Sequence, residues 1–205
     1  MNRQSIPNLL TALRIVLGIA VFFALAWAKA TGNSDLVYWA FAAYVVGALT
    51  DFFDGWLARR WNVTSVWGAI LDPIADKMAV AAALFGLLLI EPRLGIALPG
   101  FIILSRELFV SGLREVAAGK GVRFPVTQLA KWKTTAQLVA LSAQILVPAL
   151  VGTWVHTHLA VVDRSGLETL HNLQRAADAL LWIAAALTVW TGWSYASAAR
   201  KQLKP

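Results

Sequence analysis

Long apolar runs alternate with short polar breaks along most of the chain, and this pattern predicts membrane-spanning helices. A helix that crosses the hydrocarbon core of a bilayer needs about 20 predominantly apolar residues. Runs of this kind cover residues 8–30, 36–60, 67–90, 94–117, 127–151 and 172–199. The longest polar break, residues 152–168, is assigned no structure of its own. We therefore expect an all-α polytopic membrane protein with six transmembrane helices, in which residues 1–205 form a single domain.

The composition supports this interpretation and excludes several other classes of protein. Hydrophobic residues make up 59% of the 205 residues and charged residues 14%, whereas soluble domains average about 45–50% and 25%. A soluble globule of this size has too little interior to bury so much apolar surface. The same figures exclude a disordered, collagen-like or coiled-coil chain. Because no cysteine is present, a disulfide framework, a thiolate nucleophile and cysteine-ligated zinc are excluded too.

Cationic side chains are distributed unequally between the two ends of the predicted helices. If the helices alternate in direction, fourteen Lys and Arg residues fall at the end that holds both termini and four at the other end, namely Lys29, Arg93, Arg164 and Arg175. An excess of Lys and Arg marks the cytoplasmic side, so we expect both termini in the cytoplasm. The net charge of +7 then indicates attraction to anionic lipid head groups or phosphorylated substrates, and no nucleic-acid partner.

Four of the eleven acidic residues gather around one predicted cytoplasmic turn. Asp51 and Asp54 share a face near the end of the second helix, because residues three apart differ by about 60° around a helix. Asp72 and Asp76 share a face near the start of the third helix. Ionisable groups at membrane depth are costly and usually functional. Since the connection between these helices is short, we expect antiparallel neighbours whose acidic stripes face each other.

Converging carboxylates require a positive charge, because they repel one another strongly where the dielectric constant is reduced. Oxygen-only ligands select a hard divalent cation, Mg²⁺ or Mn²⁺, which binds through carboxylates together with substrate phosphate. The cluster therefore indicates phosphoryl chemistry on a metal-bound diphosphate. Two alternatives remain open. The acids can pair with arginines and only hold helices together, or they can form the ion site of a cation transporter, which more often lies near the membrane midplane.

Small residues and a proline lie among the acids. Gly55, Ala58 and Gly68 leave room for a ligand or a partner helix to approach the backbone. Pro73 cannot donate a backbone hydrogen bond, so we expect it to open the third helix locally. This opening would help to aim the acids on either side of it.

Together these residues form a motif that resembles the signature of the CDP-alcohol phosphotransferase family. The motif comprises Asp51, Asp54, Gly55, Ala58, Arg59, Gly68, Asp72 and Asp76, and no position departs from the family pattern. Family members are six-helix membrane enzymes, commonly homodimers, that use divalent metal to transfer a substituted phosphate from a CDP-linked donor to an alcohol. The resemblance implies that the four aspartates hold the metal. It also implies that Asp76 is catalytic, as the base that takes the proton from the acceptor hydroxyl.

A nucleotide pocket is implied as well. The motif residues that would shape it, with the arginine near the phosphates, are Gly55, Ala58, Arg59 and Gly68. We add Asn8 and Thr11, two polar residues of the first helix, as further candidates for contact with CDP.

Further segments narrow the resemblance to the branch of the family that makes phosphatidylglycerophosphate. These segments are residues 6–14, 71–77, 106–115 and 131–137. They imply transfer of the phosphatidyl group from CDP-diacylglycerol to sn-glycerol 3-phosphate in a bacterial inner membrane, with the active site facing the cytoplasm. Branches that make phosphatidylserine, cardiolipin or inositol phospholipids remain alternatives.

An acceptor that carries a phosphate needs cations of its own. The fourth and fifth helices supply Arg106, Arg114, Lys131 and Lys133. Arg106 lies about two turns inside the helix end, where a charge is costly, and a guanidinium suits bidentate phosphate binding. The alternative is that Arg106 pairs with Glu107, and that Arg114 and Glu115 only solvate the helix end.

Two more expectations concern polar residues outside this region. Arg175 and Asp178 are three residues apart on a predicted helix, so we expect them to pair. Gln137, Ser142 and Gln144 are candidates for hydrogen bonds between helices.

Overall fold

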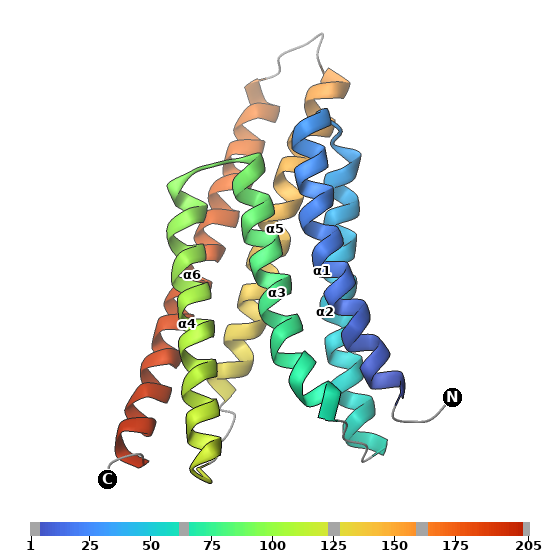
Figure 1. Cartoon of the computed structure of the whole chain (residues 1–205). Coiled ribbons are helices and arrows are strands. Elements are labelled where there is room, and N and C mark those ends of the chain that lie inside the picture. Colours follow the sequence, from blue (N-terminus) through green and yellow to red (C-terminus); the bar gives the residue numbers. More distant parts are fainter. Residues whose placement is uncertain (1–4, 62–65, 123–127, 159–163, 203–205) are drawn as a thin grey trace.

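The computed structural model is a bundle of long helices joined by short connections (Figure 1). It describes residues 5–61, 66–122, 128–158 and 164–202, with the side chains of all of these except residues 5–7, 52, 54–59, 66, 67, 69, 154–158 and 164. Six helices occupy the described part of the chain: α1 (Ser5–Thr31), α2 (Asp35–Trp61), α3 (Val66–Ile90), α4 (Leu94–Gly119), α5 (Gln128–His158) and α6 (Arg164–Gln202). The predicted all-α fold is confirmed.

Two helices extend well beyond the apolar runs that predicted them. α5 ends at His158 and α6 begins at Arg164, so the expectation of no structure is wrong for residues 152–158 and 164–168, and residues 159–163 lie outside the described part of the chain. An apolar run reports the part of a helix that fits a hydrocarbon core about 30 Å thick. The 39 residues of α6 are longer than that, about 58 Å at 1.5 Å per residue. Its polar ends therefore continue the helix beyond the apolar run.

The outer surface of the bundle is suited to lipid. Five of the described helical segments are long and apolar enough to cross a membrane: Asn8–Thr31, Ile70–Ile90, Leu94–Gly119, Gln128–Thr153 and Ser165–Gln202. Large apolar side chains point outward on them, among them Trp27, Phe101 and Trp193, which are 66%, 71% and 76% exposed. Soluble monomers rarely leave such extensive apolar surface uncovered. The chain is therefore a multi-pass membrane protein.

Helix α1 packs along both α2 and α3, whereas α2 and α3 contact each other far less. Among the described residues, the expectation that α2 and α3 pack closely against each other is therefore wrong, because α1 lies between them; acids of α2 and α3 nevertheless converge, on Arg14 of α1. Small residues allow this close approach. A Cβ atom at Gly18 would lie 3.4 Å from the backbone of Ala79, and one at Gly86 would lie 2.6 Å from Cδ1 of Leu25. A short connection thus does not decide which helix packs closest.

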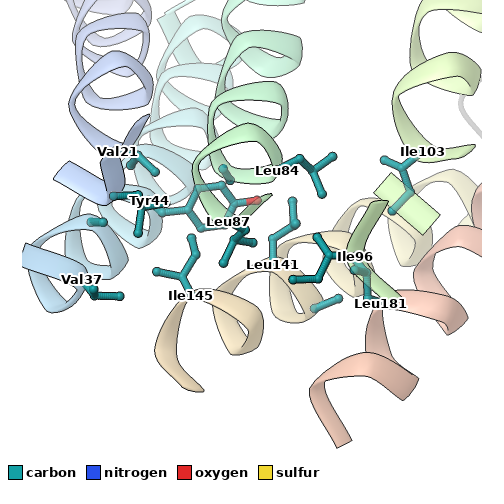
Figure 2. Close-up of a cluster of buried hydrophobic side chains, with 14 of the residues drawn as sticks. Val21, Val37, Tyr44, Leu84, Leu87, Ile96, Ile103, Leu141, Ile145 and Leu181 are labelled. Carbon is teal, nitrogen blue, oxygen red and sulfur yellow. The ribbon is translucent and has the colours of Figure 1, made fainter. Parts of the chain in front are cut away.

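An apolar core joins all six helices away from the acidic end (Figure 2). Its labelled members are Val21, Val37, Tyr44, Leu84, Leu87, Ile96, Ile103, Leu141, Ile145 and Leu181. Figure 2 shows Tyr44 reaching from α2 toward Leu84 and Leu87 of α3. This core fixes the relative positions of the helices whose ends carry the polar side chains.

Glycines in the left-handed conformation end two of the helices. Gly32 has φ of 70° after α1, and Gly121 has φ of 74° after α4. Around Gly121 the amide of Val122 donates to the carbonyl oxygen of Ala117 at 2.9 Å, which is the hydrogen bond of a Schellman motif. The start of α1 and the end of α6 lie at the same end of the bundle (Figure 1).

At the opposite end a polar network joins the α3–α4 connection to α5 and α6. Arg93 lies 2.5 Å from Asp178 and 3.2 Å from Gln144, and Gln144 donates to Asp178 at 2.8 Å. The prediction that Asp178 pairs with Arg175 is wrong, because Asp178 turns inward to the arginine of another segment. The predicted role of Gln144 in hydrogen bonding between helices is confirmed.

Candidate active site

Three of the predicted acids meet at the junction of α1, α2 and α3. Asp51 lies in the second half of α2, and Asp72 and Asp76 lie near the start of α3. On α1, Nη1 of Arg14 is 2.7 Å from Oδ1 of Asp51 and 2.7 Å from Oδ1 of Asp76. Carboxylates from two helices therefore point at a single guanidinium nitrogen of a third.

Thr11 brings the remaining described acid into this cluster. Its hydroxyl donates to Oδ1 of Asp72 at 2.6 Å, and it lies three residues before Arg14, on the same face of α1. Thr11 and Arg14 are each 2% exposed. The side chains of Asp51 and Asp76 are 49% and 60% exposed. The acids are therefore held from their buried side and remain open to a ligand.

A cavity of about 300 Å³ lies beside the acids. Its polar lining includes Arg14, Asp51, Asp76, Lys77, Glu107, Lys133 and Gln137, and its apolar lining includes Tyr44, Val80 and Leu138. Concave sites of this size bind small molecules, with a few polar groups setting the orientation of the ligand. A small phosphorylated molecule would have both acidic and basic side chains within reach here.

The opposite wall of the cavity carries an ion pair between α4 and α5. Lys133, near the start of α5, is 6% exposed and contacts Oε1 of Glu107 on α4. The same oxygen lies 3.4 Å from Nη1 of Arg106. A lysine this deeply buried needs a carboxylate or a phosphate nearby. The alternative expectation that Arg106 pairs with Glu107 is therefore met, and Lys133 shares that partner.

Arg106 and Arg114 also turn toward α6. Nη2 of Arg106 donates to the hydroxyl of Thr191 at 2.8 Å. The two guanidinium carbons lie 5.7 Å and 5.4 Å from the ring centroid of Tyr195, within the range of cation–π contact. Gly192 makes room, because a Cβ atom there would lie 2.9 Å from Cγ of Arg106. Among the described residues, neither arginine lines the cavity.

The remaining predicted site residues either are not among those that line the cavity or have side chains outside the described set. Lys131, whose side chain is described and exposed, is not among the residues that line the cavity. Residues two apart on a helix point about 160° away from each other, so Lys131 and Lys133 face different surroundings. Asn8 and Gly68 are half-buried near the starts of α1 and α3. Predicted positions in α2 whose side chains lie outside the described set are Asp54, Gly55, Ala58 and Arg59.

Pro73 lies inside α3, which is continuous from Val66 to Ile90. In Figure 1 the first turns of α3 bend away from the axis of the rest of the helix. The Nζ atom of Lys77 donates to the carbonyl oxygen of Pro73 at 2.8 Å. A proline removes one backbone hydrogen bond without breaking the helix. Its effect on α3 is therefore a bend, and the helix is not interrupted. The influence of this bend on the direction of Asp72 and Asp76 stays a prediction.

The donor set fits a hard divalent cation. Carboxylates of Asp51 and Asp76 already converge on one positively charged atom, and Asp72 lies on the same side of the helix junction. Carboxylate oxygens are the ligands that Mg²⁺ and Mn²⁺ prefer. Within the described side chains, which do not include Asp54, no group of three acidic or histidine residues is close enough to form a metal site. A metal would therefore require Asp54 or a small rearrangement of the acids.

Two residues of the site are missed by sequence reasoning. Arg14 enters there as the last residue of the segment 6–14 and as one of the fourteen cytoplasmic charges, and is given no role in the site, although an arginine inside an apolar run is itself a signal of function. Glu107 enters only as a possible partner of Arg106, and its contact with Lys133 connects residues 26 positions apart on different helices. No spacing rule within one helix could predict that contact.

An acidic cluster backed by a buried arginine, beside a cavity with a buried lysine, marks a functional site, because ionisable groups at membrane depth are costly. Comparison with known families identifies the class. The profile of the CDP-alcohol phosphatidyltransferase family matches residues 4–190. The chain belongs to this family, and the resemblance carried by its motif is confirmed.

Individual relatives match over nearly the whole chain. A protein of Cereibacter sphaeroides named CDP-diacylglycerol–glycerol-3-phosphate 3-phosphatidyltransferase is 41% identical, covering 98% of this chain and 97% of that protein. Proteins of the same name from Salmonella typhimurium and Escherichia coli are each 37% identical, covering 97% of both chains. The similarity thus includes the last third of the chain, which lies beyond the last motif of the resemblance, residues 131–137.

Proposed function

We propose that the protein transfers the phosphatidyl group from CDP-diacylglycerol to sn-glycerol 3-phosphate, giving phosphatidylglycerophosphate and CMP. The observation that carries this proposal is the placement of Asp51, Asp76 and Lys133 around one cavity. The acids suit a diphosphate that is bound through a divalent cation, and the buried lysine suits the phosphate of the acceptor. The names of the relatives support the same pair of substrates.

In the proposed reaction the C1 hydroxyl oxygen of the acceptor attacks the phosphorus that bears diacylglycerol. The bond from that phosphorus to the CMP oxygen breaks, and CMP leaves. Asp76 lines the cavity and accepts the hydroxyl proton as the new bond forms. Asp51, Asp54, Asp72 and Asp76 would hold Mg²⁺ or Mn²⁺, which supplies charge stabilisation at the diphosphate.

On the acceptor side, Lys133 would bind the glycerol phosphate. Its ammonium group already contacts the carboxylate of Glu107, so a phosphate would replace or join an existing anionic partner. Arg106 contacts the same carboxylate and could turn to the phosphate together with Lys133. An acceptor without a phosphate, such as serine or inositol, would not need these cations.

The orientation of the protein in the membrane is part of the proposal. Helix α2 has 27 residues and runs beside α1, which supports its role as the sixth span. Fourteen of the eighteen Lys and Arg residues belong to the end that holds the acids and both termini, which supports a cytoplasmic active site in a bacterial inner membrane. There the acyl chains of the donor stay in lipid while the cytosol supplies glycerol phosphate. The homodimer implied by the resemblance completes the proposal.

An acceptor screen with purified protein tests this function. The protein in detergent is given CDP-diacylglycerol and one labelled acceptor: glycerol 3-phosphate, serine or inositol. We expect CMP release and labelled lipid with glycerol 3-phosphate alone, and loss of both when EDTA removes the divalent cation. Incorporation of serine or inositol would contradict the acceptor, and full activity in EDTA would contradict the metal. Transport of the cation across a membrane, without release of CMP, would favour the alternative that the protein is a cation transporter.

A further inference from the structure

Arg14 occupies an unusual position for a cation in a membrane helix. It lies within the apolar run of α1 and is 2% exposed. A buried charge of this kind is costly unless oppositely charged groups surround it closely. Its Nη1 atom meets that requirement with two carboxylate oxygens, each at 2.7 Å, from α2 and α3.

The distances from Nη1 of Arg14 to the two carboxylate oxygens show that this nitrogen lies where a divalent cation could bind. Because Oδ1 of Asp51 and Oδ1 of Asp76 are both 2.7 Å from Nη1, the two oxygens lie at most about 5.4 Å apart, and a small movement of the acids would let one small cation contact both. A Mg²⁺ ion binds carboxylate oxygens at about 2.0–2.1 Å. The nitrogen therefore lies in the space between the carboxylates that a bridging ion needs, and the two cannot occupy it together.

The net charge of the described cluster also favours a divalent cation at this position. Asp51, Asp72 and Asp76 carry three negative charges against the single positive charge of Arg14. A divalent cation in place of the guanidinium would compensate more of this negative charge than Arg14 does. Lys77 also lines the cavity, but its ammonium group donates to the carbonyl oxygen of Pro73.

We propose that Arg14 is an exchangeable internal cation of the acidic cluster. It holds Asp51 and Asp76 together when no metal is bound, and its guanidinium moves away from their shared position when a divalent cation enters. Arg14 is thus a positioning residue that competes with the metal. This inference rests on the proposed function in one respect, namely that the acids bind a divalent cation.

The proposal separates two quantities that a merely structural arginine would move together. Without Arg14 the acids repel one another in the metal-free protein, so its thermal stability should fall. With the competitor removed, the acids should bind a divalent cation more tightly. A purely structural role would lower stability and leave metal affinity unchanged or weaker.

Mn²⁺ binding, measured by electron paramagnetic resonance on the full chain in nanodiscs, tests the proposal together with thermal unfolding in EDTA. We expect Arg14→Gln to lower the Mn²⁺ dissociation constant about tenfold, to lower Tm in EDTA, and to regain most of that loss in Mn²⁺. Arg14→Lys keeps the charge and should lie between Arg14→Gln and the unchanged protein, which provides the test if Arg14→Gln cannot be purified without metal.

Lys77→Gln is the matched control, since it removes one positive charge from the same cavity without removing a partner of the acids. We expect it to change Mn²⁺ affinity by less than Arg14→Gln does. Equal effects of the two variants, or weaker Mn²⁺ binding by both Arg14 variants, would overturn the exchange. If the unchanged protein binds no Mn²⁺, the proposed metal site itself is wrong and the exchange falls with it.

Discussion

Asp51 and Asp76 come from different helices and reach the same guanidinium nitrogen of Arg14. At this scale the site is a set of charges that each need a partner. Breaking a buried pair by removing one member leaves an uncompensated charge, whereas exchanging one cation for another does not. The cluster is therefore suited to binding a charged ligand without unfolding.

Asp76 offers the most direct test of the chemistry. We expect Asp76→Asn to lower kcat for CMP release by about a hundredfold or more, because an amide cannot accept the proton and binds a divalent cation poorly. Asp35→Asn, at the exposed start of α2, should leave kcat unchanged. The thermal unfolding of both variants should be compared, and a nearly active, folded Asp76→Asn protein would contradict the assigned role.

The two lysines of α5 should differ in their effects on the acceptor. Lys133 lines the cavity, whereas Lys131 is exposed. We expect Lys133→Gln to raise KM for glycerol 3-phosphate by about tenfold or more, with KM for CDP-diacylglycerol unchanged, since the lost charge-assisted contact is worth about 1.5–3 kcal/mol. Lys131→Gln should change this KM little. Steady-state kinetics with each substrate varied decides between them, and a larger effect from Lys131→Gln would reverse the assignment.

At the scale of helices, small residues decide which elements pack together. Gly86 lets α3 approach Leu25 of α1 so closely that a Cβ atom at Gly86 would lie 3.0 Å from Cβ of Leu25. That contact keeps α1 between α2 and α3, and so keeps Arg14 and Thr11 beside the acids. The side chains of the site depend on this packing although Gly86 lies far from them along α3.

Gly86→Val should therefore destabilise the bundle. We expect a loss of about 1–3 kcal/mol in the free energy of unfolding, because the added methyl groups overpack the α1–α3 contact. Gly112→Val is the matched control, since a Cβ atom at Gly112 meets no described atom within 4 Å. Unfolding titrations in mixed micelles provide the measurement. Equal losses in the two variants would show that helix propensity, and not the α1–α3 contact, causes the effect.

At the scale of the whole molecule, the bundle has two unlike ends. The acids and Lys133 lie toward the end where α1 begins and α6 ends, and the network of Arg93 with Asp178 lies toward the other. An enzyme with one lipid substrate and one water-soluble substrate needs its site near a single membrane face. The distribution of Lys and Arg predicts that this face is the cytoplasmic one.

Cysteine labelling tests this orientation without interference, because the chain has no cysteine. Asn33 and Ser165 are exposed at the end of the bundle opposite the acids. Lys120 and Gln202 are exposed at the end that holds the acids. In intact cells an impermeant maleimide should label Asn33→Cys and Ser165→Cys, and should label the other two only after the cells are opened. Labelling of Lys120→Cys or Gln202→Cys in intact cells would contradict cytoplasmic termini.

Much of the fold was predictable because it depends on local patterns. Apolar runs long enough for a bilayer predicted the helices, and they underestimated α5 and α6 only because hydropathy follows the membrane and not the hydrogen bonding of the backbone. The motif from Asp51 to Asp76 likewise indicated the family that the profile match confirms. The metal and the roles of the individual acids stay predictions.

The sequence by itself determined the membrane helices, the bias of charge and the acidic motif, because each depends on residues close together in the chain. The tertiary structure alone decided that Arg14 joins Asp51 and Asp76, that Lys133 enters the cavity, and that Arg106 turns to Thr191. The contact of Arg14 with Asp76 spans 62 residues and that of Arg106 with Thr191 spans 85. Such contacts depend on how closely whole helices pack, and small residues control that packing through space that no periodic pattern records.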